Sequence, residues 1–145
     1  VTRLAMPDYM ADTGEREQIS AENRKAADRI LQLCRENGAQ LLLVELPTVT
    51  SWNAARHRGV AEFAAARELE FLDLNLLYDQ MGLDGAVAFR DAGNHLNVIG
   101  ATAVTAYLGR YIARQYRLPD LRGNSRYANR QEEWVCYRRF VNGNV

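Results

Sequence analysis

The sequence is poor in cysteine and histidine, carries no excess charge and has no long apolar run. Its two cysteines among 145 residues are too few and too far apart for a zinc knuckle or a disulfide framework. The 18 basic and 18 acidic residues give zero net charge, so no overall field attracts nucleic acid. The longest apolar runs, such as Leu41–Val44, are far shorter than a membrane span. We therefore expect no nucleic-acid partner and no membrane span.

The first part of the chain has no clear hydrophobic period, and its first ten residues, VTRLAMPDYM, lack a signal-peptide core. We interpret residues 1–19 as an irregular lead-in. Ser20 suits the N-cap of a helix from Ala21 to about Asn37, and Gly38 would end that helix. The length of the chain fits one domain.

The middle of the chain alternates helix and strand patterns. Gln40–Leu46 is an almost continuous apolar run that ends at a proline, which is typical of a strand covered on both faces in a parallel sheet. We expect a helix over Ala54 to about Leu69, a strand over Glu70–Leu74 and a last helix over Val98 to about Tyr116. This alternation predicts an α/β fold with a parallel sheet.

Two strands make only a small sheet, so either further strands lie in the ends of the chain or something outside these residues completes it. We place the α/β domain at residues 20–116. Residues 117–145 form a polar, aromatic extension without a hydrophobic period. Its aromatic side chains could stack on nucleic acid, but acidic residues accompany them. We expect the extension to pack on the surface through Tyr127, Trp134, Tyr137 and Phe140.

The loop before the last helix gathers four polar residues within seven positions: Asp91, Asn94, His95 and Asn97. Loops at the carboxyl ends of parallel strands hold the sites of α/β proteins. Asn97 suits the N-cap of the helix, and Gly100 permits a close approach of its first turn. An imidazole held there can act as a general base, with Asp91 to orient it. The competing interpretation makes His95 a plain polar residue at a helix start.

Three further residues are candidates at the same edge of the sheet. Ser51 follows the first strand and would lie on the same edge as His95, but it is also explained as the cap of the helix that starts near Asn53. Asp73 and Asn75 end the second strand and would support the site from behind. If Asp73 is buried, it needs a polar partner.

The remaining histidine and carboxylates point to no metal site. His57 lies beside Arg56 and Arg58, and we interpret it as part of a solvated helix face. One imidazole with scattered carboxylates is a poor ligand set when the spacing is not tight. We therefore expect neither a metal nor a cofactor. The carboxylates weighed for this role are Asp73, Asp79 and Asp91.

Several stretches together resemble the SGNH/GDSL hydrolase superfamily. AFRDAGNHLNVIGATAVTAYLGRYI is similar to its last conserved block, in which an aspartate and a histidine precede a helix and complete a Ser-His-Asp site. ILQLCRENGAQLLLVELPTVTSWN and LEFLDLN resemble its preceding helix and strands, and LPDLRGNSRYANRQEEW is similar to the tail of bacterial members. The resemblance covers about residues 20–135 and is most specific at H-L-N-x-x-G, which begins at His95.

The resemblance implies a three-layer, flavodoxin-like parallel sheet without its N-terminal strands, with His95 as base and Asp91 as the residue that orients it. The family places its aspartate three residues before the histidine, where this chain has Ala92. The family's Gly-Asp-Ser block, which carries the nucleophile, and the Gly and Asn of its oxyanion hole do not occur in these residues. Removing either member of a serine–histidine pair costs roughly a millionfold in turnover, so His95 alone is not an esterase.

Two functions follow from the resemblance. In the first, the chain supplies the histidine and aspartate of a serine esterase or acyltransferase that acts on a small acyl ester or an acylated carbohydrate. The serine then comes from residues upstream of Val1 or from another chain. In the second, the chain is a catalytically inactive scaffold for binding or oligomerisation, because uncovered strands favour self-association or a complementing chain. Members of such families often work outside the cytoplasm, and the sequence itself defines no compartment.

Overall fold

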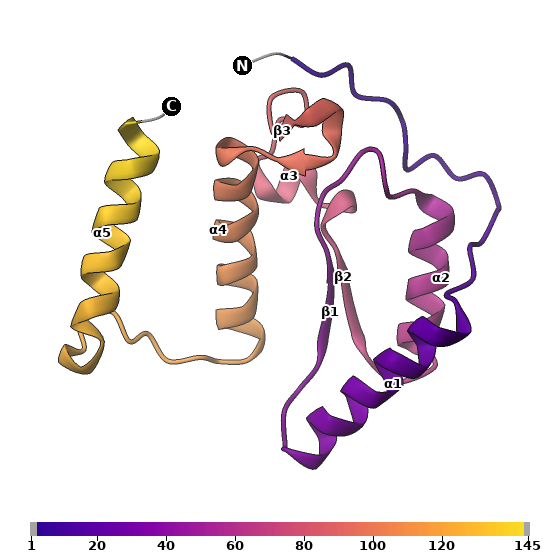
Figure 1. Cartoon of the computed structure of the whole chain (residues 1–145), viewed down its shortest axis with the longest axis horizontal. Helices are drawn as coiled ribbons and strands as arrows, with labels where there is room; N and C mark the ends of the chain where they lie inside the picture. Colours follow the sequence, from indigo (N-terminus) through magenta and orange to yellow (C-terminus); the bar gives the residue numbers. More distant parts are fainter. Residues whose placement is uncertain (1–2, 144–145) are drawn as a thin grey trace.

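The computed structural model describes residues 3–143, in which helices alternate with short strands (Figure 1). The elements in chain order are α1 (Ala21–Glu36), β1 (Leu42–Glu45), α2 (Ala54–Ala65), β2 (Glu70–Asp73), η1 (Leu74–Leu76), α3 (Tyr78–Met81), β3 (Phe89–Arg90), η2 (Asp91–Gly93), β4 (His95–Leu96), α4 (Val98–Gln115), η3 (Ser125–Tyr127) and α5 (Ala128–Gly143).

Local signals set the ends of the first helix as predicted. The Ser20 hydroxyl accepts a hydrogen bond from the Asn23 N–H at 3.1 Å, and Gly38 follows the helix with a φ of +65°. The second helix ends at Ala65, four residues before the predicted Leu69. The chain turns there because the Leu69 N–H bonds back to a carbonyl of the last helical turn, with Glu68 at a φ of +57°.

A two-stranded parallel sheet forms the centre of the molecule, which confirms the α/β class with a parallel pair. Leu42 pairs with Glu70 and Glu45 pairs with Asp73. Within residues 3–143, β1 and β2 pair only with each other, so each has an open edge. β1 is less buried than predicted for a strand covered on both faces, because all four of its residues are half-buried.

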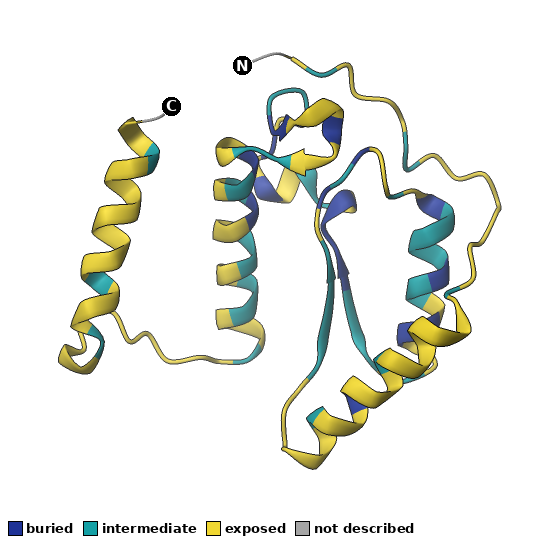
Figure 2. Cartoon of the chain, viewed as in Figure 1, coloured by how far each residue is buried: buried dark blue, intermediate teal, exposed yellow. Residues whose placement is uncertain are grey.

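Helices lie on both sides of this sheet (Figure 1). Paired residues of a parallel ladder point to the same face, and residues along a strand alternate between the faces. On one face, Tyr116 of α4 donates a hydrogen bond to Glu70 of β2 at 2.8 Å. On the other, His57 of α2 contacts the ring of Phe71. The core lies between the sheet and α4, where buried residues line the inner side of that helix (Figure 2). Its members are Val49, Leu72, Leu74, Met81, Leu83, Ala88, Phe89 and Val104.

The N-terminal segment (residues 3–19) is irregular, as expected, but it is held along its length. It runs past the β3–β4 turn and down the outer side of α2 (Figure 1). The Leu4 N–H donates to the Ala86 carbonyl at 2.7 Å, and the Glu17 N–H donates to the Ala55 carbonyl at 3.0 Å. Arg58 of α2 donates to the Glu15 carbonyl at 2.7 Å. Hydrogen bonds therefore fix the N-terminal segment near both of its ends.

The C-terminal extension differs from the prediction. Most of it is the helix α5, which has no buried residue and is separated from α4 by an exposed connection (Figure 2). Of the four expected anchors Tyr127 is half-buried, but the other three are exposed, with exposed fractions of 54% for Trp134, 52% for Tyr137 and 66% for Phe140. Within residues 3–143, none of the helices combines the length and apolar character that crossing a membrane requires.

Candidate functional site

A tight turn between β3 and β4 brings Asp91 back onto His95. Three successive residues, Asp91, Ala92 and Gly93, have positive φ values of 44°, 57° and 99°. This left-handed path brings the Asp91 carboxylate to both the backbone and the ring of His95. Its Oδ1 accepts the His95 N–H at 2.9 Å, and its Oδ2 lies 2.6 Å from Nδ1 of the ring. Asp91 and His95 therefore form a dyad, although Ala92 occupies the position at which the SGNH family places its aspartate.

The charge state of Asp91 defines the histidine tautomer. Its pKa is lowered by the His95 side-chain hydrogen bond, by the His95 N–H, and by the positive charges of His95 and Arg90. An ionised carboxylate is an acceptor only, so the hydrogen on Nδ1 of neutral His95 points to Asp91. The other ring nitrogen, Nε2, then carries the lone pair. With 59% of its side chain exposed, His95 is accessible as a base.

The loop after β1 holds this turn in place. The Val49 N–H donates to the Gly93 carbonyl at 2.8 Å. Thr50 donates its hydroxyl hydrogen to Oδ1 of Asn94 at 3.0 Å, and Nδ2 of Asn94 lies 3.3 Å from Nδ1 of His95. Asn94 therefore ties the turn to Thr50, on a loop that begins at the carboxyl end of a parallel strand, and does not bond Nδ1, whose hydrogen points to Asp91.

Asn97 fixes the start of α4 behind the dyad, as its predicted capping role requires. Its Oδ1 accepts the N–H groups of Ile99 and Gly100 at 2.9 and 3.1 Å. Its Nδ2 donates to the Val87 carbonyl at 2.7 Å. At Gly100 the backbone of Ala88 comes so near that an added Cβ would lie 2.3 Å from its carbonyl oxygen. His95 is therefore followed by a rigid helix start.

The structure does not bring a serine onto His95. The hydroxyl oxygen of Ser51 lies 2.8 Å from that of Thr48, and no hydrogen bond joins Ser51 to His95 among the residues described. The cap of α2 is Asn53 and not Ser51, since Asn53 Oδ1 accepts the Arg56 N–H at 2.9 Å. The other two serines lie at Ser20, the cap of α1, and at Ser125 in η3.

The second histidine has a role that sequence reasoning missed. His57 is not on a solvated face, because its Nδ1 lies 2.7 Å from Oδ2 of Asp73, whose side chain is 2% exposed. Trp52 donates to the same oxygen at 2.8 Å, and Asn75 donates both its N–H and its amide to Oδ1 at 2.9 and 2.8 Å. The sequence signal that could have revealed this contact is Asp73 itself, since a carboxylate in an apolar strand needs polar partners.

This cluster is a support of the sheet edge and is separate from the dyad. The four donors use both oxygens of Asp73. Asn75 extends the network by accepting the Thr48 N–H and the Tyr9 hydroxyl through Oδ1, each at 2.9 Å. Burial and the charge of Asp73 raise the pKa of the neighbouring Glu45. Asp73 and Asn75 thus hold the loop after β1, which in turn holds the turn of the dyad.

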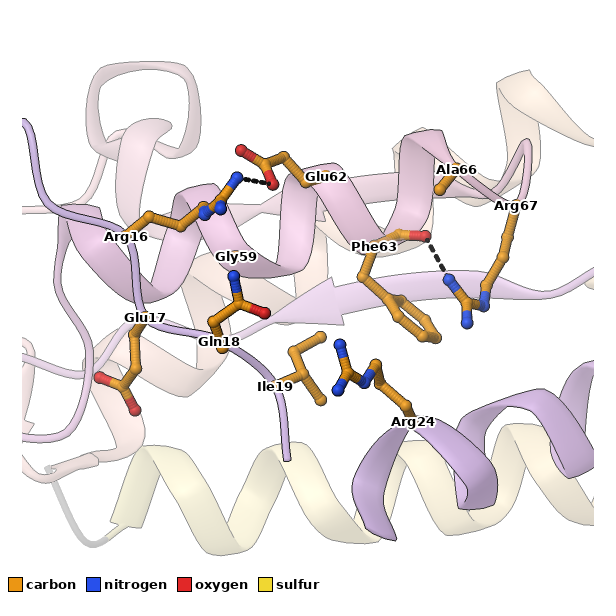
Figure 3. A pocket seen from close by; sticks show the side chains of 10 residues that line it. All are labelled: Arg16, Glu17, Gln18, Ile19, Arg24, Gly59, Glu62, Phe63, Ala66 and Arg67. Atoms are coloured by element: carbon orange, nitrogen blue, oxygen red, sulfur yellow. Dashed lines mark hydrogen bonds and ion pairs between the residues drawn. The ribbon is translucent and has the colours of Figure 1, made fainter. Parts of the chain in front are cut away.

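Two hollows lie at different places on the chain. One, of about 570 Å³, lies beside the dyad and is lined by Arg3, Leu4, Phe89, Arg90, Asp91, Ala92, Gly93 and Asn97. The other, of about 190 Å³, lies between the N-terminal segment, α1 and α2 (Figure 3). In the second hollow Arg16 pairs with Glu62 at 2.5 Å, and Arg67 pairs with Asp28. The first hollow is lined by Asp91, the partner of His95, so it is the candidate for a substrate.

No group of three His, Cys, Asp or Glu side chains within residues 3–143 is arranged to hold a metal ion. Asp73, Asp79 and Asp91 therefore form no ligand cluster. No protein-family model, no curated protein and no solved structure matches this chain. The chemistry of the site is therefore inferred from the geometry of the chain itself.

Proposed function

We propose that this chain supplies the histidine–aspartate half of a serine ester hydrolase or acyltransferase site of the SGNH/GDSL type. The observation that carries the proposal is the pairing of His95 with Asp91 through two hydrogen bonds, which leaves Nε2 exposed as a base. The resemblance around His95 and the parallel strand pair behind it add support. The proposal includes a three-layer, flavodoxin-like domain whose remaining strands lie outside residues 1–145.

The proposed reaction uses His95 twice in each half of the cycle. A serine hydroxyl attacks the acyl carbonyl carbon, and its proton passes to Nε2 of His95. The tetrahedral intermediate then expels the alkoxide, which leaves as an alcohol with the proton from Nε2. A water molecule or an acceptor hydroxyl next attacks the acyl carbon of the acyl-serine and gives its proton to Nε2. The bond from the acyl carbon to the serine oxygen then breaks, the serine oxygen takes the proton from Nε2, and the acid or the new ester leaves. Asp91 stabilises the imidazolium each time.

Turnover of p-nitrophenyl acetate by the full reading frame that encodes this chain tests the proposal. We expect His95→Ala to lower turnover roughly a millionfold and Asp91→Asn to lower it roughly 10⁴-fold, because the base is lost or misoriented. His57→Gln is the matched control, since it removes the imidazole that lies outside the dyad. Melting curves check that each variant folds. Unchanged turnover in His95→Ala would contradict the proposal.

A fluorophosphonate probe locates the nucleophile. We expect it to label the full-length protein at a serine outside residues 1–145, and to leave the isolated chain unlabelled. Labelling of the isolated chain that disappears in Ser51→Ala would place the nucleophile at Ser51 and overturn this part of the proposal.

The second candidate is a scaffold that binds another chain, and the open edges of β1 and β2 favour it. An unpaired strand edge presents backbone donors and acceptors to a second strand. In this case the isolated chain should form dimers or larger species in light scattering after gel filtration, and the full-length protein should show no esterase activity.

A further inference from the structure

Arg90 stands directly across the β3–β4 ladder from His95. The two residues are paired in the antiparallel register. Directly opposed residues of such a pair project from the same face, with their Cβ atoms about 5 Å apart. The guanidinium of Arg90 and the imidazole of His95 therefore extend from one face of the same two-residue ladder.

The charge of Arg90 is not neutralised by a partner in the described part of the chain. Arg90 is exposed, and no hydrogen bond or ion pair with another residue of the segment 3–143 engages its guanidinium. Its charge contributes to lowering the pKa of Asp91, but both oxygens of that carboxylate already accept hydrogen bonds from His95. Arg90 thus remains able to bind an external anion.

The hollow beside the dyad has more cations than anions. Arg3 and Arg90 both line it, with Asp91 as the single acidic lining residue. Arg3 reaches Asp84 at 3.3 Å, but both side chains are more than half exposed, and such a pair is weak and easily exchanged. In the hollow of Figure 3, two of the three lining arginines are held by carboxylates, Arg16 by Glu62 and Arg67 by Asp28, each at 2.5 Å.

We propose that the ester handled at this site is anionic, with a carboxylate or a similar oxyanion that Arg90 holds while its acyl carbon faces His95. This inference rests on the proposed function and names its substrate class. A guanidinium binds a carboxylate through two parallel N–H bonds, which fixes orientation as well as charge. The apolar side chain of Leu4 in the same hollow would receive the short carbon chain between the two groups.

Binding of two matched esters tests the charge preference without catalysis. Monoethyl succinate carries a carboxylate, and ethyl butyrate is its neutral counterpart. We expect NMR titration of the chain to give a dissociation constant about two- to fivefold lower for monoethyl succinate, since one exposed charge pair contributes a factor in about that range. An ester with a phosphonate in place of the carboxylate shows which oxyanion fits better.

Two substitutions at position 90 and one control locate the effect. Arg90→Gln should abolish the preference, whereas Arg90→Lys should keep part of it, because the charge stays but the two-pronged contact is lost. Arg114→Gln, at the opposite end of α4 from the dyad, should keep it in full. Equal affinity for both esters in the native chain would overturn the inference, as would an equal loss in Arg90→Gln and Arg114→Gln.

The outcome separates the inference from the proposed function. His95→Ala should keep the charge preference, because Arg90 and not His95 holds the anion. If the full-length protein hydrolyses neither ester while the preference persists, the esterase function fails and the anion site stands. If it hydrolyses both esters at equal kcat/KM, the esterase function stands and the anionic substrate class is refuted.

Discussion

Asp91 and His95 stabilise each other through two contacts at an exposed turn, and this makes the pair sensitive to acid. Because hydrogen bonds from His95 hold the pKa of Asp91 below its ordinary value of 3.8, the folded chain binds this proton more weakly than the unfolded chain does. The pair therefore contributes stability above about pH 4. That contribution is lost as the pH falls through the lowered pKa.

Replacing His95 should reverse this shift. In His95→Ala the ring donor is lost, so we expect the pKa of Asp91 to rise toward 3.8. The carbon-13 shift of the Asp91 carboxyl group, followed against pH, measures it. Asp12 is an internal control, because its low pKa comes from the Gly14 N–H and from Arg58. An Asp91 titration that is the same with and without His95 would show that the pair is not formed in solution.

Asp73 is the carboxylate on which the sheet edge depends. Its side chain is buried, and four donors meet it. Asp73→Asn keeps the shape of the side chain but replaces one of its two oxygens by an NH₂ donor, which then faces other donors. We therefore expect the free energy of unfolding to fall by about 2–4 kcal/mol. Urea unfolding measures the loss. Asp8→Asn, at an exposed carboxylate, should change the stability by less than about 0.5 kcal/mol.

The contrast between the two histidines shows what sequence can predict at this scale. His95 and Asp91 are four residues apart, so a local turn suffices to join them, and the spacing could be recognised. His57 and Asp73 are joined only because α2 packs on β2, a tertiary contact with no signature at either residue alone. The neighbouring Arg56 and Arg58 made the position look solvated, whereas their side chains bind the N-terminal segment.

At the scale of elements, α4 contains two glycines in different surroundings: Gly100 lies against the backbone of Ala88, and Gly109 faces open space. A Cβ at Gly100 would lie 2.3 Å from the Ala88 carbonyl oxygen, and one at Gly109 would meet nothing within 4 Å. We expect Gly100→Ala to lower the free energy of unfolding by about 1–3 kcal/mol through the clash. Gly109→Ala should raise it by up to about 1 kcal/mol through helix propensity. Urea unfolding of both variants compares them, and a stabilising Gly100→Ala would contradict the tight helix start.

The N-terminal segment depends on a second glycine. A Cβ at Gly59 would lie 1.9 Å from the carbonyl oxygen of Glu17, so alanine there must push the segment off α2. We expect faster amide exchange in residues 12–18 of Gly59→Ala, measured by hydrogen–deuterium exchange with mass spectrometry. Gly109→Ala, on another helix, should leave this exchange as it is. Protection that persists in Gly59→Ala would mean that the segment lies elsewhere in solution.

The elements that sequence predicted well are those whose ends are set locally. Ser20 caps α1 and Asn97 caps α4 through side chains a few residues away, so the starts of both helices follow from residue type. The β3–β4 turn is different, because three consecutive positive φ values have no strong sequence signal at Asp91 and Ala92. The helix α5 went unpredicted for another reason: it buries none of its residues, so packing imposes no apolar period on it.

On the scale of the whole molecule, the part of the chain that precedes α5 provides the stability. The sheet, the helices α1 to α4 and the segments between them contain the buried residues, whereas α5 has none (Figure 2). A two-stranded sheet gives little stability by itself, so it depends on the helices and loops that pack against it. The open edges of β1 and β2 agree with the proposal that further strands complete the domain.

This arrangement predicts that the C-terminal extension can be removed without loss of the core. A chain that ends at Asp120 lacks α5, and because α5 has no buried residue, its free energy of unfolding should change by less than about 1 kcal/mol. Leu74→Ala is the reference for a real core defect, since Leu74 is fully buried and its truncation should cost about 2–5 kcal/mol. Urea unfolding followed by circular dichroism compares the two. If the shortened chain loses as much stability as Leu74→Ala, α5 packs against the body in solution, and its exposed aromatic rings belong to an intramolecular or intermolecular interface.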